Sequence, residues 1–473
     1  MHAGGLIGVV LALAIAFSNV AVAEAAAEVA ASGSPPAYAV ELDRRARERF
    51  GADAPGCIVE VIRDGREEFV GAYGLADIET RTPLQPSSRM AIASVSKQFT
   101  AFAILLLHHD GQLDLDAPIA SYLDRLPEWG RQVTVADLLH HASGVRDYIQ
   151  LQELRGLRYE DYYSADDLFD LIGRTTLEFE PGARTSYSNS GYFLLGQIVE
   201  RVSGMSLRSF MARRIFGPLG MTDTFLQDDM DERFDRQAFG YTLDENGAIE
   251  RDGSTLEIVG DGGLVTTAHD LALWDANFYD NRLGGGAALI ERMLRGYTLR
   301  NGEPTPHAAG LFVRNHRGQI RIGHTGNYGG FKALVQRYPE LATTIVLLCN
   351  SDAISPIAEE RWITDLVMGD LLEPRGPSRA PQAQDLDRSH QALRRPLRTG
   401  RYYSEELDVE WRLHRAGVGY EAQLPSGVTF SLDAAGPERL VMREGWFEVI
   451  PVRGGFELRY DDMTPIVFRR TGR

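Results

Sequence analysis

The strand-forming segments of this sequence lie at the two ends of a long helical region, and this separation constrains the fold more than any other feature. Residues 56–63 and 68–73 are strand-like and are joined by Asp64-Gly65, a strong hairpin signal. Strand-like segments return only near the end of the region, at 319–324, 332–338 and 343–348. One sheet must therefore be assembled from distant parts of the chain, which predicts an α+β fold.

The remaining segments of this region carry apolar residues at helical spacing. The stretch 94–107 has a high apolar density, which predicts a central buried helix. Other helices are predicted at 38–50, 190–202, 207–215, 269–279 and 359–372. The middle of the chain is thus expected to supply most of the helices.

The periodicity of the sequence changes after a polar, proline-rich stretch. This stretch, 373–393, is interpreted as a linker between domains. Beyond it, Leu407, Val409 and Trp411 alternate with charged residues. Period two with frequent glycine turns predicts a small all-β unit over 394–473, a barrel of about eight short strands.

The charge balance limits the classes of partner. Acidic residues outnumber basic ones by 66 to 49, which gives a formal net charge of −17. Nucleic-acid phosphates need a basic surface, so we expect no nucleic-acid partner. The acidity is otherwise interpreted as a source of solubility.

The first residues predict export. Residues 6–17 form a short apolar run, and Ala21-Val22-Ala23 follows with the small side chains that signal peptidase prefers. Residues 1–23 are therefore interpreted as a signal peptide. We expect a secreted or periplasmic protein with no stable membrane span after cleavage. Because no Lys or Arg precedes the run, a retained membrane anchor is the alternative.

The sequence has two cysteines, Cys57 and Cys349, and each lies in a predicted buried strand. Their spacing fits no metal-binding motif. We expect two small buried thiols. A disulfide is the alternative, because export would permit one.

The pattern Ser-Val-Ser-Lys at 94–97 opens the predicted buried helix. Residues three apart share a helix face, so the Ser94 hydroxyl and the Lys97 amine are expected within hydrogen-bond reach. A serine hydroxyl needs a base to act as a nucleophile, and a desolvated lysine has a lowered pKa. Arginine stays protonated and cannot take that role.

Lysine is otherwise almost absent from this chain. Only two of the 49 basic residues are lysines, Lys97 and Lys332. Lys97 thus persists where arginine would fail chemically. Lys332 is interpreted as a surface lysine on a strand, with a contact to a substrate carboxylate as the alternative.

Two further patterns carry groups that a hydrolase needs. Tyr-Ser-Asn at 187–189 precedes a predicted helix and offers a phenol for proton transfer and an amide for a substrate carbonyl. His-Thr-Gly at 324–326 ends a predicted strand, whose edge can supply a backbone N–H to an oxyanion. Either pattern alone is also compatible with a structural turn.

In this order, the three patterns resemble the motifs of the penicillin-recognising serine hydrolases. Within that family the chain is similar to the branch of class C β-lactamases, D-Ala-D-Ala carboxypeptidases, D-aminopeptidases and class VIII-type esterases. The resemblance implies a β-lactamase/transpeptidase-like domain over 37–372, an antiparallel sheet flanked by helices. The unit at 394–473 resembles the lipocalin-like domains of D-aminopeptidase-type relatives.

The resemblance also implies roles for individual residues. Ser94 would be the nucleophile, Lys97 its base, and Tyr187 a group that assists proton transfer to the leaving group. The substrate-binding residues would be Asn189, His324, Thr325, Gly326 and Asn327, with the backbone N–H groups of Ser94 and Asn327 forming the oxyanion hole. No metal or other cofactor is implied.

The histidine at position 324 stands where β-lactamases usually have lysine, which favours peptidase or esterase activity. We expect an exported serine hydrolase that cleaves an amide or ester of a small-molecule or peptide substrate through a Ser94 acyl-enzyme, with a D-amino-acid peptidase, carboxypeptidase-type or esterase activity. A β-lactamase, and a penicillin-binding sensor that does not turn over, are the alternatives. The sequence contains neither the Gly-x-Ser-x-Gly pattern of α/β-hydrolases nor the His-Glu-x-x-His pattern of zinc hydrolases.

Overall fold

The computed structural model describes residues 36–157, 163–244, 247–252, 257–374, 396–417, 419–435, 437–442, 447–459 and 465–472. The predicted signal peptide, 1–23, and nearly all of the predicted linker, 373–393, lie outside these ranges. Within them, no helix has both the length and the apolar character needed to cross a bilayer.

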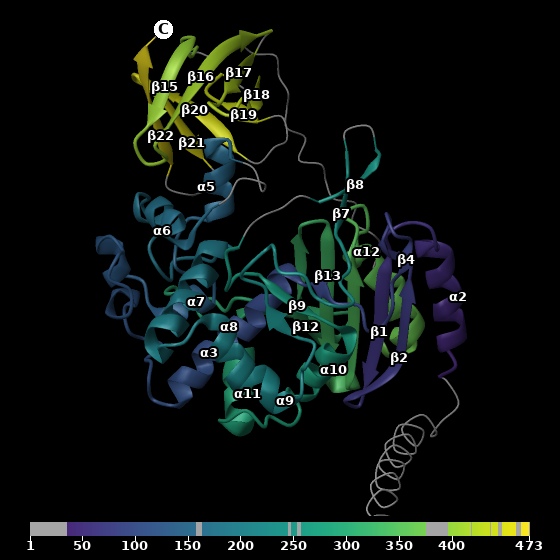
Figure 1. Cartoon of the computed structure of the whole chain (residues 1–473). Helices are drawn as coiled ribbons and strands as arrows, with labels where there is room; N and C mark the ends of the chain where they lie inside the picture. Colours follow the sequence, from purple (N-terminus) through teal and green to yellow (C-terminus); the bar gives the residue numbers. More distant parts are fainter. Residues whose placement is uncertain are drawn as a thin grey trace, which may run out of the picture.

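A seven-stranded antiparallel sheet forms the centre of the larger part of the described chain (Figure 1). Its strands are β1 (Cys57–Arg63), β2 (Arg66–Tyr73), β10 (His307–Ala308), β11 (Leu311–His316), β12 (Gln319–Tyr328), β13 (Phe331–Tyr338) and β14 (Thr343–Cys349). Their order is β10-β11-β12-β13-β14-β1-β2, so the first hairpin pairs with the last of these strands. The predicted α+β fold is therefore confirmed.

Helices cover both faces of this sheet. On one face lie α2 (Ala39–Phe50) and α12 (Pro356–Met368), and on the other lie α3 (Lys97–His109) and α10 (Ala268–Ala276). Because side chains alternate along a strand, one strand contributes side chains to the packing on both faces of the sheet. The strand residues packed with α2 and α12 include Val59, Val61, Leu334 and Leu347. Those packed in the main core with α3 include Ile58, Val335, Val346 and Leu348.

The other predicted helices form with small shifts at their ends. The segment predicted at 207–215 begins as an α-helix and continues as a π-helix at Ala212–Phe216. The remaining α-helices are α4 (Val135–Leu139), α5 (Tyr148–Arg155), α6 (Ala165–Gly173), α7 (Asn189–Ser203), α8 (Leu207–Met211), α9 (Gly217–Leu219) and α11 (Gly286–Leu294). Short strands elsewhere are β3 (Leu75–Asp77), β4 (Thr82–Pro83), β5 (Met90–Ala91), β6 (Phe225–Leu226), β7 (Tyr241–Leu243), β8 (Ile249–Arg251) and β9 (Leu264–Thr266).

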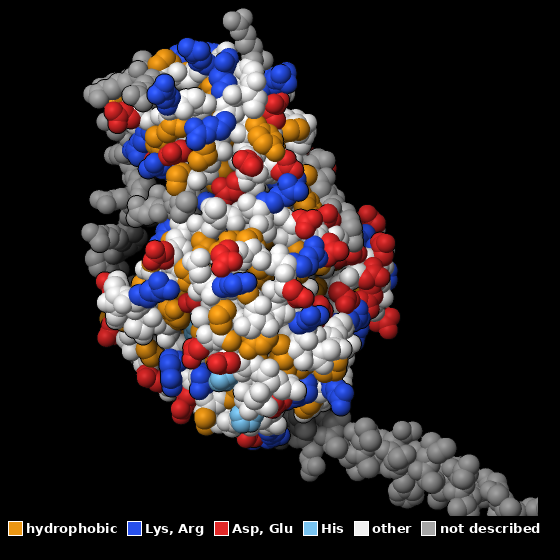
Figure 2. Space-filling view, turned by 90° about the vertical axis from the view of Figure 1, so that its left-hand side faces the viewer, with side chains coloured by type: hydrophobic (Ala, Val, Ile, Leu, Met, Phe, Trp, Pro, Cys, Tyr) orange, Lys and Arg blue, Asp and Glu red, His pale blue; other side chains and the backbone are white. Residues whose placement is uncertain are grey.

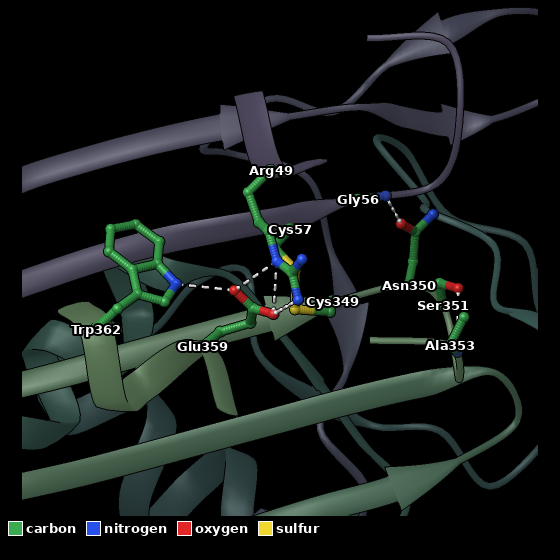
Figure 3. The surroundings of a disulfide bond; sticks show 9 residues. All are labelled: Arg49, Gly56, Cys57, Cys349, Asn350, Ser351, Ala353, Glu359 and Trp362. Carbon is green, nitrogen blue, oxygen red and sulfur yellow. Dashed lines mark hydrogen bonds and ion pairs between the residues drawn. A yellow bond between two sulfur atoms is a disulfide. The ribbon is translucent and has the colours of Figure 1, made fainter. Parts of the chain in front are cut away.

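Cys57 and Cys349 form a disulfide between neighbouring strands (Figure 3). They lie directly opposite each other where β1 pairs with β14, and their Cα atoms are 4.0 Å apart. The expectation of two free thiols is therefore wrong, because the antiparallel register brings the two side chains together. Beside the bond, Glu359 of α12 accepts hydrogen bonds from Arg49 and from the indole of Trp362 (Figure 3).

The C-terminal part is a closed barrel, in which each strand pairs with the next strand in sequence and the last strand pairs with the first. Its eight strands are β15 (Gly400–Ser404), β16 (Val409–Ala416), β17 (Gly419–Gln423), β18 (Thr429–Ala434), β19 (Leu440–Met442), β20 (Glu448–Val452), β21 (Gly455–Arg459) and β22 (Ile466–Gly472). The interior is filled by aromatic rings, with Trp411 packed against Phe430, Phe456 and Phe468. The predicted all-β barrel is confirmed.

The barrel lies above α5 and α6, at one end of the larger part (Figure 1). On the face seen in Figure 2, acidic and basic side chains are interspersed over most of the surface, and acidic side chains gather along the right-hand edge of the larger part.

Candidate active site

Ser94 lies in a short 3-10 turn, Ala93–Ser96, that leads directly into α3. The predicted helix thus begins as a 3-10 turn, in which side chains three apart eclipse one another. Ala93 adopts a positive φ of 46°, an unfavourable conformation for a residue with a Cβ. This backbone turn places the Ser94 hydroxyl 3.0 Å from the Lys97 amine.

Lys97 is completely buried and is held by three contacts. Besides Ser94 Oγ, its Nζ lies 2.8 Å from Asn189 Oδ1 and 2.7 Å from the backbone oxygen of Asp261. Burial lowers the pKa of Lys97 to about 8, although the charges of Asp261 and Asp147 act in the opposite direction. The neutral amine is therefore accessible near neutral pH.

Asn189 is the first residue of α7, and Ser188 caps that helix by accepting a hydrogen bond from Gly191 N. While Asn189 Oδ1 faces Lys97, its backbone N–H and side-chain Nδ2 both donate to Asp147 Oδ2, at 2.5 and 2.8 Å. The Asn189 side chain thus links the lysine to a buried carboxylate. Its orientation is fixed by partners at both ends.

Asp147 and Asp261 are buried carboxylates that were not among the predicted site residues. Asp147 caps the N-terminus of α5, where its side chain accepts from the N–H groups of Ile149 and Gln150. Asp261 accepts from the Tyr148 hydroxyl at 2.9 Å through Oδ2. Burial raises the pKa of both carboxyl groups, while the Lys97 charge lowers it. The only sequence signal for Asp147 was its residue type, which is common at helix N-caps, and no helix was predicted to begin there.

Tyr187 lies beside Ser94 and Lys97. The Lys97 Nζ is 5.0 Å from the centre of the Tyr187 ring, and His141 stacks on that ring at 4.5 Å. Burial raises the pKa of Tyr187 well above its usual value, against the effect of a hydrogen bond with the Ser94 side chain. The phenol is therefore protonated at neutral pH and can donate a hydrogen bond.

His324 is buried close to the same ring, 5.9 Å from Tyr187 between ring centres. Burial and the nearby Lys97 charge lower the pKa of His324 to about 3, so the imidazole is neutral at neutral pH. Its Nδ1 lies 2.5 Å from the Thr325 carbonyl oxygen, which can only accept. The single ring proton is therefore on Nδ1, and Nε2 is left as an acceptor.

The strand β12 passes very close to the 3-10 turn that carries Ser94. A Cβ at Gly326 would lie 2.1 Å from the Ile92 backbone oxygen, so only glycine fits here. β11 pairs with β12 only as far as Gly323, and residues 324–328 extend beyond it. This extension presents a strand edge next to Ser94, and Asn327 on it lines the adjoining cavity.

A cavity of about 380 Å³ opens beside Ser94. Four groups described above line it together with Ser94, namely Tyr148, Asn189, Asp261 and Asn327. Lys332 is not among its lining residues. The larger apolar side chains in its wall are Ile149, Met230, Phe234, Phe239, Ile258, Val265 and Phe331. Among the residues that the structure describes, no cluster of His, Cys, Asp or Glu could hold a metal ion.

Residues 42–367 match the protein family described as Beta-lactamase. This chain belongs to the Beta-lactamase family. The predicted membership of the penicillin-recognising serine hydrolases is thereby confirmed. The match covers the sheet, the helices on both its faces and every residue of the site described above.

Relatives of this family member include proteins named D-aminopeptidase. The one from Brucella anthropi is 32% identical over 308 residues, which cover 64% of this chain and 58% of that relative. The one from Brucella melitensis biotype 1 is 32% identical over 297 residues, which cover 62% and 56%. The chain thus spans little more than half the length of these curated relatives.

Solved structures show the same fold. The octameric penicillin-binding protein homologue from Pyrococcus abyssi superposes with a TM-score of 0.61 at 23% identity, and the match covers 91% of this Beta-lactamase family chain and 98% of that one. The D-amino acid amidase from Ochrobactrum anthropi SV3, solved with L-phenylalanine amide, is 26% identical with a TM-score of 0.55. That match covers 66% of this chain and 90% of the amidase.

Proposed function

We propose that this protein is a serine hydrolase that cleaves amides of D-amino acids through an acyl-enzyme on Ser94. The observation that carries the proposal is the contact between the Ser94 hydroxyl and the completely buried Lys97 amine, whose pKa is lowered to about 8. A base of this pKa can accept the serine proton near neutral pH. The relatives named D-aminopeptidase and D-amino acid amidase support the choice of acyl donor.

The neutral amine is oriented for this role. With two N–H groups it donates to Asn189 Oδ1 and to the Asp261 carbonyl, and its lone pair is left facing the Ser94 O–H. Ser94 Oγ then attacks the substrate carbonyl carbon as its proton moves to Lys97 Nζ. The backbone N–H groups of Ser94 and Asn327 hold the oxyanion.

Collapse of the tetrahedral intermediate breaks the amide C–N bond. The leaving amine takes a proton from the Tyr187 hydroxyl, which Lys97 re-protonates with the proton that it took from Ser94. Water then attacks the ester carbonyl carbon as one of its protons moves to the neutral Lys97 Nζ. The bond from that carbon to Ser94 Oγ breaks, Oγ takes the proton back from Lys97, and the carboxylic acid is released. Every proton is thus accounted for by groups that lie within the described site.

The cavity supports an apolar side chain on the acyl donor. Its wall beyond Ser94 includes Ile149, Ile258 and Phe331, which favour burial of apolar surface. Asn189 has a second side-chain N–H besides the one it gives to Asp147, and this N–H is assigned to the substrate. His324, Thr325 and Gly326 form the strand edge along which the substrate backbone lies. D-phenylalanine amide is accordingly the first substrate to test.

We also propose that the protein acts outside the cytoplasm, secreted or in a periplasm. The apolar run at 6–17 supports this location. The disulfide between Cys57 and Cys349 supports it as well, because such bonds persist mainly in oxidising compartments.

The decisive experiment is active-site labelling of the purified protein with a fluorophosphonate, followed by peptide mapping. We expect covalent label on Ser94 and none in Ser94→Ala. Equal labelling of Ser94→Ala and wild type would mean that another residue is the nucleophile.

A substrate panel then separates the activities. D-phenylalanine amide, L-phenylalanine amide, p-nitrophenyl butyrate, diacetyl-Lys-D-Ala-D-Ala and nitrocefin represent the competing substrate classes. We expect turnover of the D-amide and little or none of its L-enantiomer. Turnover of nitrocefin alone would identify a β-lactamase, and label without turnover of any substrate would identify a penicillin-binding sensor.

A further inference from the structure

Helix α5 connects the barrel to the active site. Its first residues, Tyr148 and Ile149, line the cavity beside Ser94. Its N-terminal cap is Asp147, which binds the Asn189 amide and thereby sets the position of the oxygen that contacts Lys97. Figure 1 shows the same helix directly below the barrel. A displacement of α5 would therefore reach Lys97 through two hydrogen bonds.

Glu406 of the barrel holds the chain immediately before α5. Its Oε1 accepts hydrogen bonds from Arg146 Nε at 3.0 Å, from Thr176 N at 3.0 Å and from Thr176 Oγ1 at 3.1 Å. The Arg146 side chain is only 3% exposed, and its Nε also donates to the Thr176 carbonyl. A buried guanidinium needs a carboxylate partner, and Glu178 is a second acidic group that interacts electrostatically with Arg146.

The barrel also holds the other end of α5. The indole N–H of Trp411, at the centre of the barrel, donates to the Leu154 carbonyl in the last turn of α5 at 2.9 Å. At the C-cap, a Cβ at Gly156 would lie 2.3 Å from Ser426 Oγ and 2.9 Å from a methyl group of Leu424, so the two surfaces are in close contact. Both ends of this helix are thus bound to the barrel.

We infer that Glu406 is a positioning residue for the catalytic lysine, acting through Arg146, Asp147 and Asn189. The inference rests on the acyl-enzyme function proposed above. The barrel then contributes to catalysis, because its contacts fix the position of α5, whose cap Asp147 aligns Asn189 with Lys97. A misplacement of catalytic groups by about 1 Å can lower the rate by about 100-fold.

The test compares the rate of Ser94 labelling by a small fluorophosphonate in wild type, Glu406→Ala, Glu406→Gln and Glu405→Ala. Glu405 is the matched control, since it is the exposed neighbour of Glu406 and carries the same charge. We expect the rate to fall on the order of tenfold in Glu406→Ala. Glu406→Gln should recover part of it, because its amide oxygen can still accept from Arg146 and Thr176, and Glu405→Ala should match wild type.

Thermal melts of each variant establish that labelling is measured on folded protein. A contact that only stabilises the fold would lower the melting temperature of Glu406→Ala and leave the labelling rate of the folded protein unchanged. That result, or an equal loss in Glu405→Ala, would overturn the inference. If Glu406→Ala is unfolded at the assay temperature, the labelling rate of Glu406→Gln, a side chain of nearly the same volume, is compared with wild type instead. A rate below that of wild type supports the inference, and an equal rate overturns it. A wild-type protein that takes no label would instead refute the proposed function.

Discussion

Lys97 is the side chain on which the chemistry of this site depends. It is completely buried, and its nitrogen is within 3.0 Å of three oxygens, those of Ser94, Asn189 and Asp261. Desolvation disfavours the ammonium form, which is why the pKa falls although two carboxylates are near. In a chain with almost no lysine, this residue type is retained where deprotonation is required.

The Lys97 pKa predicts the pH dependence of acylation. Because the neutral amine accepts the Ser94 proton, the labelling rate should rise with increasing pH until it levels off above the pKa of about 8. His324, with a pKa of about 3, should add no step near neutrality. The pH profile is measured by quenching the labelling reaction at several times, at pH values on both sides of 8. Ser94→Ala is the background control. A rate independent of pH across this range would exclude Lys97 as the base.

At the scale of elements, the site depends on how closely β12 approaches the 3-10 turn of Ser94. Two backbones meet at Gly326 and Ile92 without a side chain between them. This contact sets the distance between the Ser94 hydroxyl and the strand edge that carries Asn327. The same contact explains why the pattern at 324–326 ends in glycine.

Gly326→Ala should therefore disturb both stability and activity. The added Cβ would lie 2.1 Å from the Ile92 oxygen, and overpacking of this kind costs about 1–3 kcal/mol of unfolding free energy. Urea unfolding and the labelling rate measure the two effects. Gly173→Ala in α6 is the control, because its nearest neighbouring atom is 4.0 Å away and alanine favours a helix. Wild-type stability and activity in Gly326→Ala would contradict the close approach.

At the scale of the whole molecule, the seven-stranded sheet is assembled from segments at opposite ends of the sequence of the larger part. β1 pairs with β14, and the disulfide joins two residues that are 292 positions apart in sequence. A crosslink of this span removes much of the conformational freedom of the unfolded chain. The bond lies on the face covered by α2 and α12, and Arg49, Glu359 and Trp362 lie beside it (Figure 3).

Reduction of this disulfide should destabilise the protein by about 2–4 kcal/mol. Urea unfolding monitored by tryptophan fluorescence, with and without reductant, measures the loss of unfolding free energy. The double variant Cys57→Ala/Cys349→Ala should show the lower stability in both conditions. An equal effect of reductant on wild type and on the double variant would show that the pair is not bonded in solution.

Local chemistry and local pattern were sufficient to predict much of this protein. Ser94 and Lys97 follow from residue type and spacing within one turn, and the Asp64-Gly65 hairpin follows from the positive φ that both residues adopt, 51° and 71°. The helices and the barrel follow from periodicities that are visible within short windows. All of these features depend on neighbours in sequence.

Tertiary structure alone decided the rest. The disulfide required the register between β1 and β14, and the roles of Asp147 and Asp261 required the packing of α5 and of the segment before β9 around Lys97. The docking of Glu406 on Arg146 joins residues from two domains. These contacts depend on the relative placement of distant segments, and no local propensity encodes a partner that lies hundreds of positions away.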